Sequence, residues 1–198
     1  MSQETVGFSI RKFVIISVLI CAFTGCSVNV RRQASARVAE PPVFVAMPPA
    51  EFPTALLQAF ANHALNMPFR NMLPVRASEQ MFPSAFQLET VGLTAYARLP
   101  DAERKNDLYL FSPLDNYWPS DYYVNDVRIP FTCGFIVQVL PFNGGSQIQV
   151  YEYQPIVVAG KRWLFGHSGP GRYLDIRRVD PTVEDRNALL REIRRVLR

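Results

Sequence analysis

The chain is poor in the residues that bind metals and form disulfides. Its 198 residues include 2 histidines and 3 cysteines. His63 and His167 are isolated in the sequence, and neither they nor Cys133 show the ligand spacing of a zinc site. Cys133 is the only thiol beyond the first 26 residues, so it has no partner for an internal disulfide. It lies in an apolar run, and we expect it to be buried and inert, with no metal or cofactor bound by the chain.

The chain also lacks a long apolar run, a phosphate loop and a strong charge. The longest apolar run covers 13–23, which is short of the roughly 20 residues that a membrane-spanning helix needs. Gly144-Gly145 and Gly169 to Gly171 are not followed by Lys-Ser or Lys-Thr, which argues against a nucleotide-phosphate site. The formal net charge of +4 is too small to indicate a nucleic-acid-binding protein.

The first 26 residues contain the most distinctive pattern. Arg11 and Lys12 precede the apolar run, and small residues ending in Cys26 follow it. A charged segment, a short apolar segment and small residues in this order are typical of a secretory signal. A plain cleaved signal peptide and an uncleaved anchor are the alternatives to the interpretation that follows.

The four residues Phe23-Thr24-Gly25-Cys26 resemble the lipobox of bacterial lipoproteins, although that family prefers leucine where Phe23 stands. The resemblance implies that Cys26 carries a diacylglycerol and palmitate, and that cleavage makes it the first residue of the mature chain. Ser27 stands where enteric lipoproteins of the inner membrane carry aspartate. By this resemblance we expect a lipid-anchored protein of the cell envelope, in the outer membrane and facing the periplasm.

The composition divides the chain into three parts. Residues 1–25 are the expected signal peptide, and 26–50 form an expected tether that begins at the lipidated cysteine. Pro41-Pro42 and Pro48-Pro49 favour extended backbone in this tether. Residues 51–198 are long enough for a single domain with its own core.

The hydrophobic periodicity of 51–198 predicts an α+β fold. Apolar residues recur at helical spacing from Pro53 to Asn66 and again after Thr182, where Leu189, Leu190 and Ile193 share one stripe. Between these helices we expect an antiparallel sheet of about four to six strands, with both helices packed on it. The order loosely resembles helix-grip domains, including those in a lipoprotein subunit of the outer-membrane β-barrel assembly machinery. The candidate strand segments are 88–99, 107–112, 128–141, 147–153 with its continuation 156–158, 162–165, and 172–179, which is a strand or an extended lead-in to the last helix. Expected loops and turns are 67–87, 100–106, 113–125, 143–146 and 159–161.

No catalytic pattern is convincing. Gly166-His167-Ser168-Gly169-Pro170 approaches the G-x-S-x-G elbow, but Pro170 replaces the last glycine and no helix follows. A triad of Cys133, His167 and Asp175 would need a reactive thiol, whereas an apolar strand buries a thiol and raises its pKa. Seven further carboxylates considered as acid–base pairs fall mostly at turns and loops, where we expect solvated acids. These are Glu89, Asp101, Glu103, Asp107, Asp115, Asp121 and Asp126.

We therefore expect a non-catalytic protein, and two function classes stay open. The first is an interaction or scaffold module that binds an envelope protein through a sheet edge or through the aromatic side chains Tyr117, Trp118, Tyr122 and Tyr123. The second is a module that binds a lipid or another amphipathic small molecule between the sheet and the helices. Nucleic acid is not an expected partner, since the arginines of the last helix are typical of a solvated face.

Overall fold

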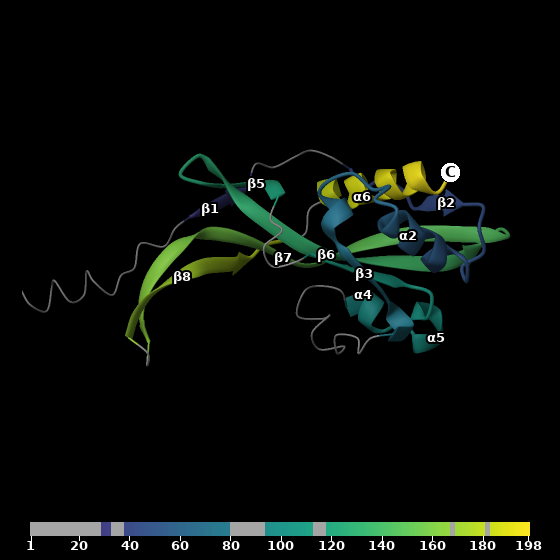
Figure 1. The fold of residues 1–198 in the computed structure, drawn as a ribbon, viewed down its shortest axis with the longest axis horizontal. Coiled ribbons are helices and arrows are strands. Elements are labelled where there is room, and N and C mark those ends of the chain that lie inside the picture. The colour runs from purple at the N-terminus through teal and green to yellow at the C-terminus, as the bar shows by residue number, and fades with distance from the viewer. Residues whose placement is uncertain (1–28, 33–37, 80–93, 113–117, 167–168, 181–182) are drawn as a thin grey trace, which may run out of the picture.

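The computed structural model describes residues 29–32, 38–79, 94–112, 118–166, 169–180 and 183–198. They form one antiparallel sheet with helices on both of its faces (Figure 1). Helices α2 (Phe52–Ala61) and α6 (Val183–Val196) lie on one face, and the short helices α4 (Thr94–Ala97) and α5 (Asp101–Arg104) lie on the other. The expected α+β class with an antiparallel sheet is confirmed.

The sheet has eight strands, so the expected number of four to six is wrong. Two long strands, β6 and β7, pair along most of their length and form its spine. β5 and then β4 pair with the other edge of β6, while β2 and β8 pair with the other edge of β7. β1 extends the sheet beyond β5, and β3 extends it beyond β4. The strands are β1 Val30–Arg32, β2 Val43–Val45, β3 Leu73–Arg76, β4 Leu108–Phe111, β5 Trp118–Val124, β6 Val127–Phe142, β7 Gly145–Gly166 and β8 Gly169–Arg178.

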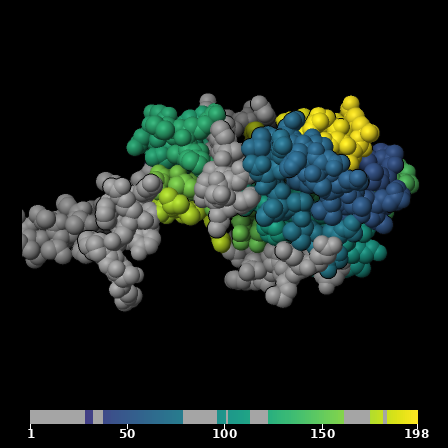
Figure 2. Space-filling model, viewed as in Figure 1, coloured from purple at the N-terminus to yellow at the C-terminus, as the bar shows by residue number. Residues whose placement is uncertain are grey.

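The sheet is longer than the part that the helices cover. α2, α6, α4 and α5 cover the region around β2, β3 and β4 (Figure 1). The first half of β6, the second half of β7, and β1, β5 and β8 extend beyond the helices. We call these five strand segments the arm. In the space-filling view, α2 and α6 form adjoining surfaces at one end of the molecule, and the arm projects from the other (Figure 2).

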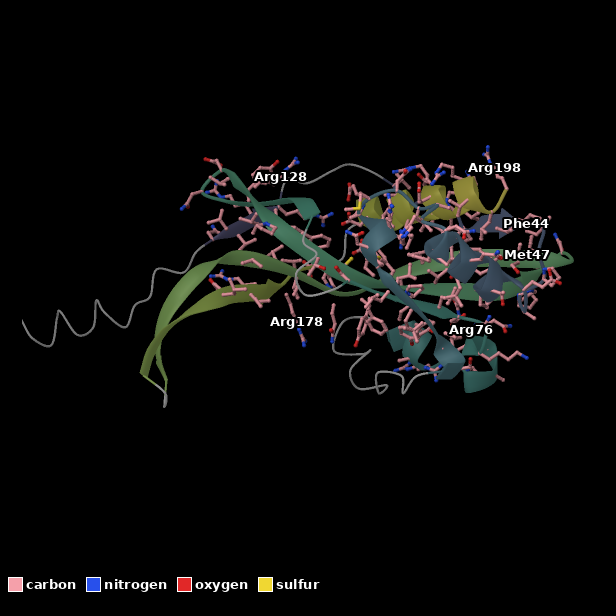
Figure 3. The ribbon with its side chains drawn as sticks, viewed as in Figure 1. Phe44, Met47, Arg76, Arg128, Arg178 and Arg198 are labelled. Carbon is pink, nitrogen blue, oxygen red and sulfur yellow. The ribbon has the colours of Figure 1, made fainter. Side chains whose placement is uncertain are left out.

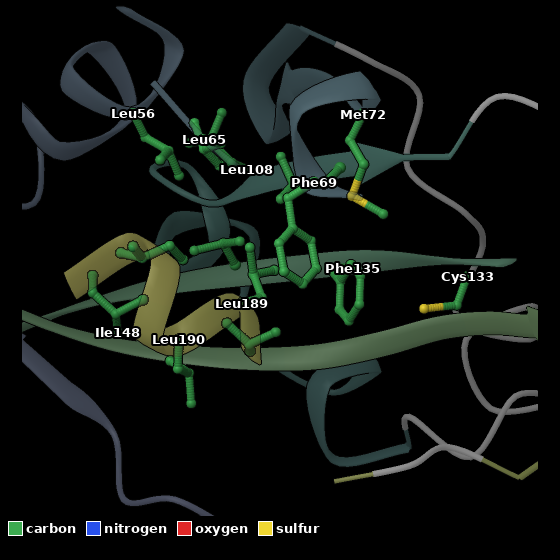
Figure 4. Packing of buried hydrophobic residues seen from close by; sticks show 14 of the residues in the cluster. Leu56, Leu65, Phe69, Met72, Leu108, Cys133, Phe135, Ile148, Leu189 and Leu190 are labelled. Atoms are coloured by element: carbon green, nitrogen blue, oxygen red, sulfur yellow. The ribbon is translucent and has the colours of Figure 1, made fainter. Parts of the chain in front are cut away.

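The main core lies between the spine and the two long helices. Alternate residues of β6, including Phe135 and Val137, point toward α2 and α6, as period-two strands require. Leu56 of α2 and Leu189 and Leu190 of α6 meet them, each at most 2% exposed (Figure 4). The apolar stripe expected for the last helix therefore faces the core.

A second, smaller core lies on the opposite face of the sheet. It contains Tyr96 of α4, Tyr109 of β4, Ile136 of β6 and Tyr153 of β7. Because β6 is covered on both faces here, nearly every residue from Phe135 to Leu140 is apolar. That continuous pattern is typical of a strand buried on both sides.

Several expected boundaries are wrong. Thr94–Ala97 is helical rather than extended, and Asp101–Arg104 forms a helical turn inside the expected charged turn. The rest of the expected strand 88–99 up to residue 93 lies outside the described residues. Trp118–Val124 is a strand rather than part of a loop, because it pairs with β1 and β6. Leu73–Arg76, within the expected irregular segment, pairs with β4.

The expected turn at 159–161 is also absent from β7. This strand continues without a turn from Gly145 to Gly166, and its pairing with β8 shifts register between Val158 and Gly160. The first helix ends at Ala61 instead of Asn66, so His63 follows the helix, with a left-handed φ of 52°. The expected hairpin turn at 143–146 is confirmed in position, with Asn143 and Gly144 at positive φ.

Part of the expected tether belongs to the folded domain. Val43 and Val45 of β2 pair with β7 and are 1% and 7% exposed. Just before them, the Asn187 side chain of α6 accepts a hydrogen bond from the Glu40 backbone amide at 2.9 Å. Arg191 forms an ion pair with the Glu40 carboxylate. These contacts fix the segment to α6, so 38–45 is not a free linker.

Candidate interaction surface

The aromatic residues that we expected to form one interaction loop do not lie on one face of the sheet. Tyr117 lies outside the described residues, and Trp118 begins β5. Tyr122 is 4% exposed, stacks on Phe131 with ring centroids 5.9 Å apart, and donates a hydrogen bond to the Asp180 carbonyl at 2.6 Å. Burial raises its pKa to about 12. Tyr122 is therefore a core residue, and the expectation that it forms part of an interaction loop is wrong.

Tyr123 points to the opposite face from Tyr122, as neighbouring residues of a strand must. It is half-buried, and its hydroxyl accepts hydrogen bonds from Arg128 at 3.2 and 3.3 Å. The Arg128 guanidinium also lies 5.8 Å from the centre of the Tyr123 ring. This pair leaves Tyr123 as the one described side chain of the aromatic group that reaches the surface.

Within the described residues, β8 pairs with β7 alone and therefore forms an edge of the sheet. Val179, the residue directly after β8, donates its amide N–H to the Pro155 carbonyl at 3.1 Å. Hydrogen-bonded positions alternate along an antiparallel strand, so Arg177, two residues earlier, also directs its backbone groups toward β7. Because backbone direction alternates along a strand, the N–H and C=O groups of Leu174, Ile176 and Arg178 point away from β7. These groups form a row that another strand could pair with.

The side chains along this edge are divided by face. Leu174 and Ile176 are each 48% exposed on the face away from α6, and Arg178 on the same face extends into solvent (Figure 3). On the other face, Arg177 and Asp175 form an ion pair at 2.9 Å. We call the segment from Leu174 to Arg178 the β8 edge. The residue pattern predicted a strand here but not its position at an edge, because a sequence does not show which strands are neighbours.

One cavity lies at the other end of β7, between β7, α6 and the segment before β2. Its volume is about 210 Å³, and its charged lining residues are Glu40 and Arg186. Pockets that enclose drug-sized ligands commonly measure about 300–1,000 Å³ and are mostly apolar. The cavity is therefore small for a lipid, and two charged side chains lie in its lining.

Asp107 shows the largest departure from expectation among the described carboxylates. It is fully buried, whereas we expected a solvated acid at a turn. Its carboxylate accepts hydrogen bonds from the Tyr96 hydroxyl at 2.7 Å and from the Val139 amide at 2.9 Å. Burial raises its pKa to about 7, against the opposing effects of these hydrogen bonds and of Arg104. Asp107 joins α4 to β6, and its full burial gives a substrate no access.

The sites considered for nucleophilic and metal chemistry give no assembled centre in the described part of the chain. Cys133 is 1% exposed, and burial raises the pKa of its thiol well above the ordinary value, as expected for an inert cysteine. His167 and Ser168 lie outside the described residues. The described residues contain no cluster of three or more His, Cys, Asp or Glu side chains suited to a metal. Among them, too, no helix has the length and apolar character to cross a bilayer.

Comparison with known proteins gives no relative: no family model, no curated protein and no solved structure matches this chain.

Proposed function

We propose that this chain is a lipid-anchored lipoprotein of the cell envelope that acts as a non-catalytic interaction module. Cys26 would hold it in the outer membrane, facing the periplasm, and the β8 edge would bind an envelope protein by strand addition. The observation that carries the proposal is the outward row of backbone groups at Leu174, Ile176 and Arg178, flanked by two half-exposed apolar side chains.

The chemistry of this edge suits strand addition. In this mode backbone hydrogen bonds provide affinity, and alternate side chains provide specificity. Folded proteins usually protect a long edge strand by covering it, bending it or placing charges on it. Arg177 and Arg178 provide charge here, but Leu174 and Ile176 supply apolar surface between the free backbone groups. A sheet edge that is only partly protected against strand pairing favours the binding of a strand from another protein.

The alternative, a binding module for a lipid or another amphipathic small molecule, has less support. The main core between the sheet and the helices is filled by side chains such as Leu56, Phe135 and Leu189, each at most 1% exposed. The cavity of about 210 Å³ beside Arg186 is the candidate volume for such a ligand. Solvent extraction of the purified protein followed by lipid mass spectrometry tests this alternative directly.

A proline substitution tests the β8 edge. Ile176→Pro removes one outward N–H group without removing a hydrogen bond to β7, which an edge strand tolerates. The matched control is Ile176→Thr, which keeps the N–H group and a β-branched side chain. Wild type and both variants are cross-linked in whole envelopes and purified, and the captured proteins are identified by mass spectrometry.

We expect the partner to be lost from Ile176→Pro and kept by Ile176→Thr, with both variants folded by circular dichroism. Loss from both variants would assign binding to the Ile176 side chain rather than to backbone pairing. Retention by both would show that the β8 edge is not the docking site.

A further inference from the structure

The β8 edge is complementary to itself, and we propose that its occupant is a second copy of this chain. The inference rests on the proposed function of this edge and names the partner. Two β8 edges related by a twofold axis would pair antiparallel and join two sheets into one. Such an interface uses the same surface on both copies, as closed dimers do.

Backbone direction limits the possible registers. Only Leu174, Ile176 and Arg178 direct their backbone groups outward, so an outward residue of one copy must face an outward residue of the other. This condition holds when the twofold axis passes at a residue, and it fails when the axis passes between two residues. The axis can therefore lie at any one of the five residues from 174 to 178. Each position brings a different set of side chains together.

Charge separates these five registers, because like charges directly opposite one another destabilise paired strands. An axis at Asp175 would oppose two aspartates, and an axis at Arg177 or Arg178 would oppose two arginines. An axis at Leu174 forms no ion pair among the described residues.

An axis at Ile176 places Asp175 of each copy opposite Arg177 of the other. The two residues already form an ion pair at 2.9 Å on one face of β8, so dimerisation would join two such pairs into a group of four alternating charges. On the opposite face, the two Ile176 side chains would meet and cover surface that is 48% exposed in each copy. Opposite charges on one face and apolar contact on the other favour this register.

The contact is short and would be weak between freely diffusing molecules. Stable protein interfaces bury about 1,200–2,000 Å², more than one pair of edge strands supplies. The proposed anchor at Cys26 would hold both copies on one membrane, where their effective concentration is high. The test is therefore made in the membrane with the full chain.

Disulfide trapping distinguishes the register. In Ile176→Cys the two introduced thiols would face each other, whereas in Arg177→Cys each would face Asp175 of the other copy. Envelopes that contain each variant are treated with a mild oxidant and analysed on non-reducing gels. The unsubstituted chain is the background control, since its Cys133 is buried. We expect a dimer band from Ile176→Cys and none above background from Arg177→Cys.

Charge exchange then tests complementarity. Asp175→Arg in the Ile176→Cys background should lower the trapped fraction about tenfold, which corresponds to about 1.4 kcal/mol. The double exchange Asp175→Arg with Arg177→Asp should restore it, because the opposite charges are again aligned. Thermal melting of each variant verifies that the domain stays folded.

No trapping, equal trapping at positions 176 and 177, or no effect of Asp175→Arg would overturn this proposal. If Ile176→Pro still loses a captured protein in the envelope experiment, the edge binds a different protein and the proposed function stands. If it loses nothing, both proposals fail.

Discussion

The buried carboxyl of Asp107 gives a prediction with a definite sign. Its environment raises its pKa from 3.8 to about 7, chiefly through burial. Between these two values the native state therefore binds more protons than the unfolded state. The contribution of Asp107 to stability is fully present below about pH 4 and is lost as the pH rises toward about 7. A difference of about three pH units corresponds to about 4 kcal/mol at 1.36 kcal/mol per unit, as an order of magnitude.

Asp107→Asn replaces the ionisable carboxyl group with a neutral amide of nearly the same shape. The amide oxygen can accept from the Val139 N–H, and the amide NH₂ can donate to the Tyr96 hydroxyl, which accepts as well as donates. Near pH 4, where Asp107 is largely neutral in the native state, the two proteins should differ little in stability. Near pH 8 the asparagine variant should be more stable, by up to about 4 kcal/mol, because no buried charge remains.

Urea unfolding of both proteins between about pH 4 and about pH 8, at constant ionic strength, measures this difference. Other titrating groups contribute equally to both curves and cancel in the comparison. Glu192 is one of these: hydrogen bonds from Arg195 and Asn66 lower its pKa. Parallel pH dependences for wild type and Asp107→Asn would refute the reasoning. Asp107→Leu is the control, because it also lacks the buried charge but leaves two buried donors without an acceptor; it should be less stable than Asp107→Asn at every pH, by about 1–3 kcal/mol for each donor.

Three further predictions concern the core, the anchor and chemistry. Leu190→Ala should lower the free energy of unfolding by about 2–5 kcal/mol, because Leu190 is 2% exposed. Arg191→Ala should lower it by at most about 1 kcal/mol, because it removes only a surface ion pair. Equal melting shifts for the two variants would contradict this placement of the helix. Cys26→Ala should abolish palmitate labelling and mislocalise the chain, and labelling that persists would exclude this anchor. His167→Ala should leave the cellular phenotype unchanged, and loss of function in a folded, anchored variant would contradict the non-catalytic proposal.

Local patterns in the sequence predicted the elements whose stability depends on their own residues. The stripe containing Leu189, Leu190 and Ile193 predicted α6, and alternation predicted the part of β7 from 147 to 153. The glycines at 144 and 145 predicted the turn between the two long strands. These signals depend on residues that are close together in the chain, so a single sequence is enough to detect them.

The segment of the expected aromatic interaction residues was harder to predict from the sequence. Trp118 to Val124 contains Pro119 and Asp121, which favour a loop, yet pairing with β1 and β6 makes it a strand. Tyr122 and Tyr123 are adjacent aromatics with the same local composition. Only the face of the sheet that each one meets decides that Tyr122 is buried and Tyr123 reaches the surface.

By itself, the sequence determined the α+β class, the two long helices, the burial of Cys133 and the expectation of a lipid anchor at Cys26. The first three depend on composition or on spacing within a few residues, and the last depends on the resemblance of residues 23–26 to a lipobox. The tertiary structure decided which strand is an edge, which aspartate is buried and which part of the expected tether is folded. Asp107 is buried because α4 and β6 close around it, and Ile176 is exposed because none of the described helices covers the face of β8 on which it lies. Both outcomes depend on segments far apart in the chain, whose pairing no local pattern encodes.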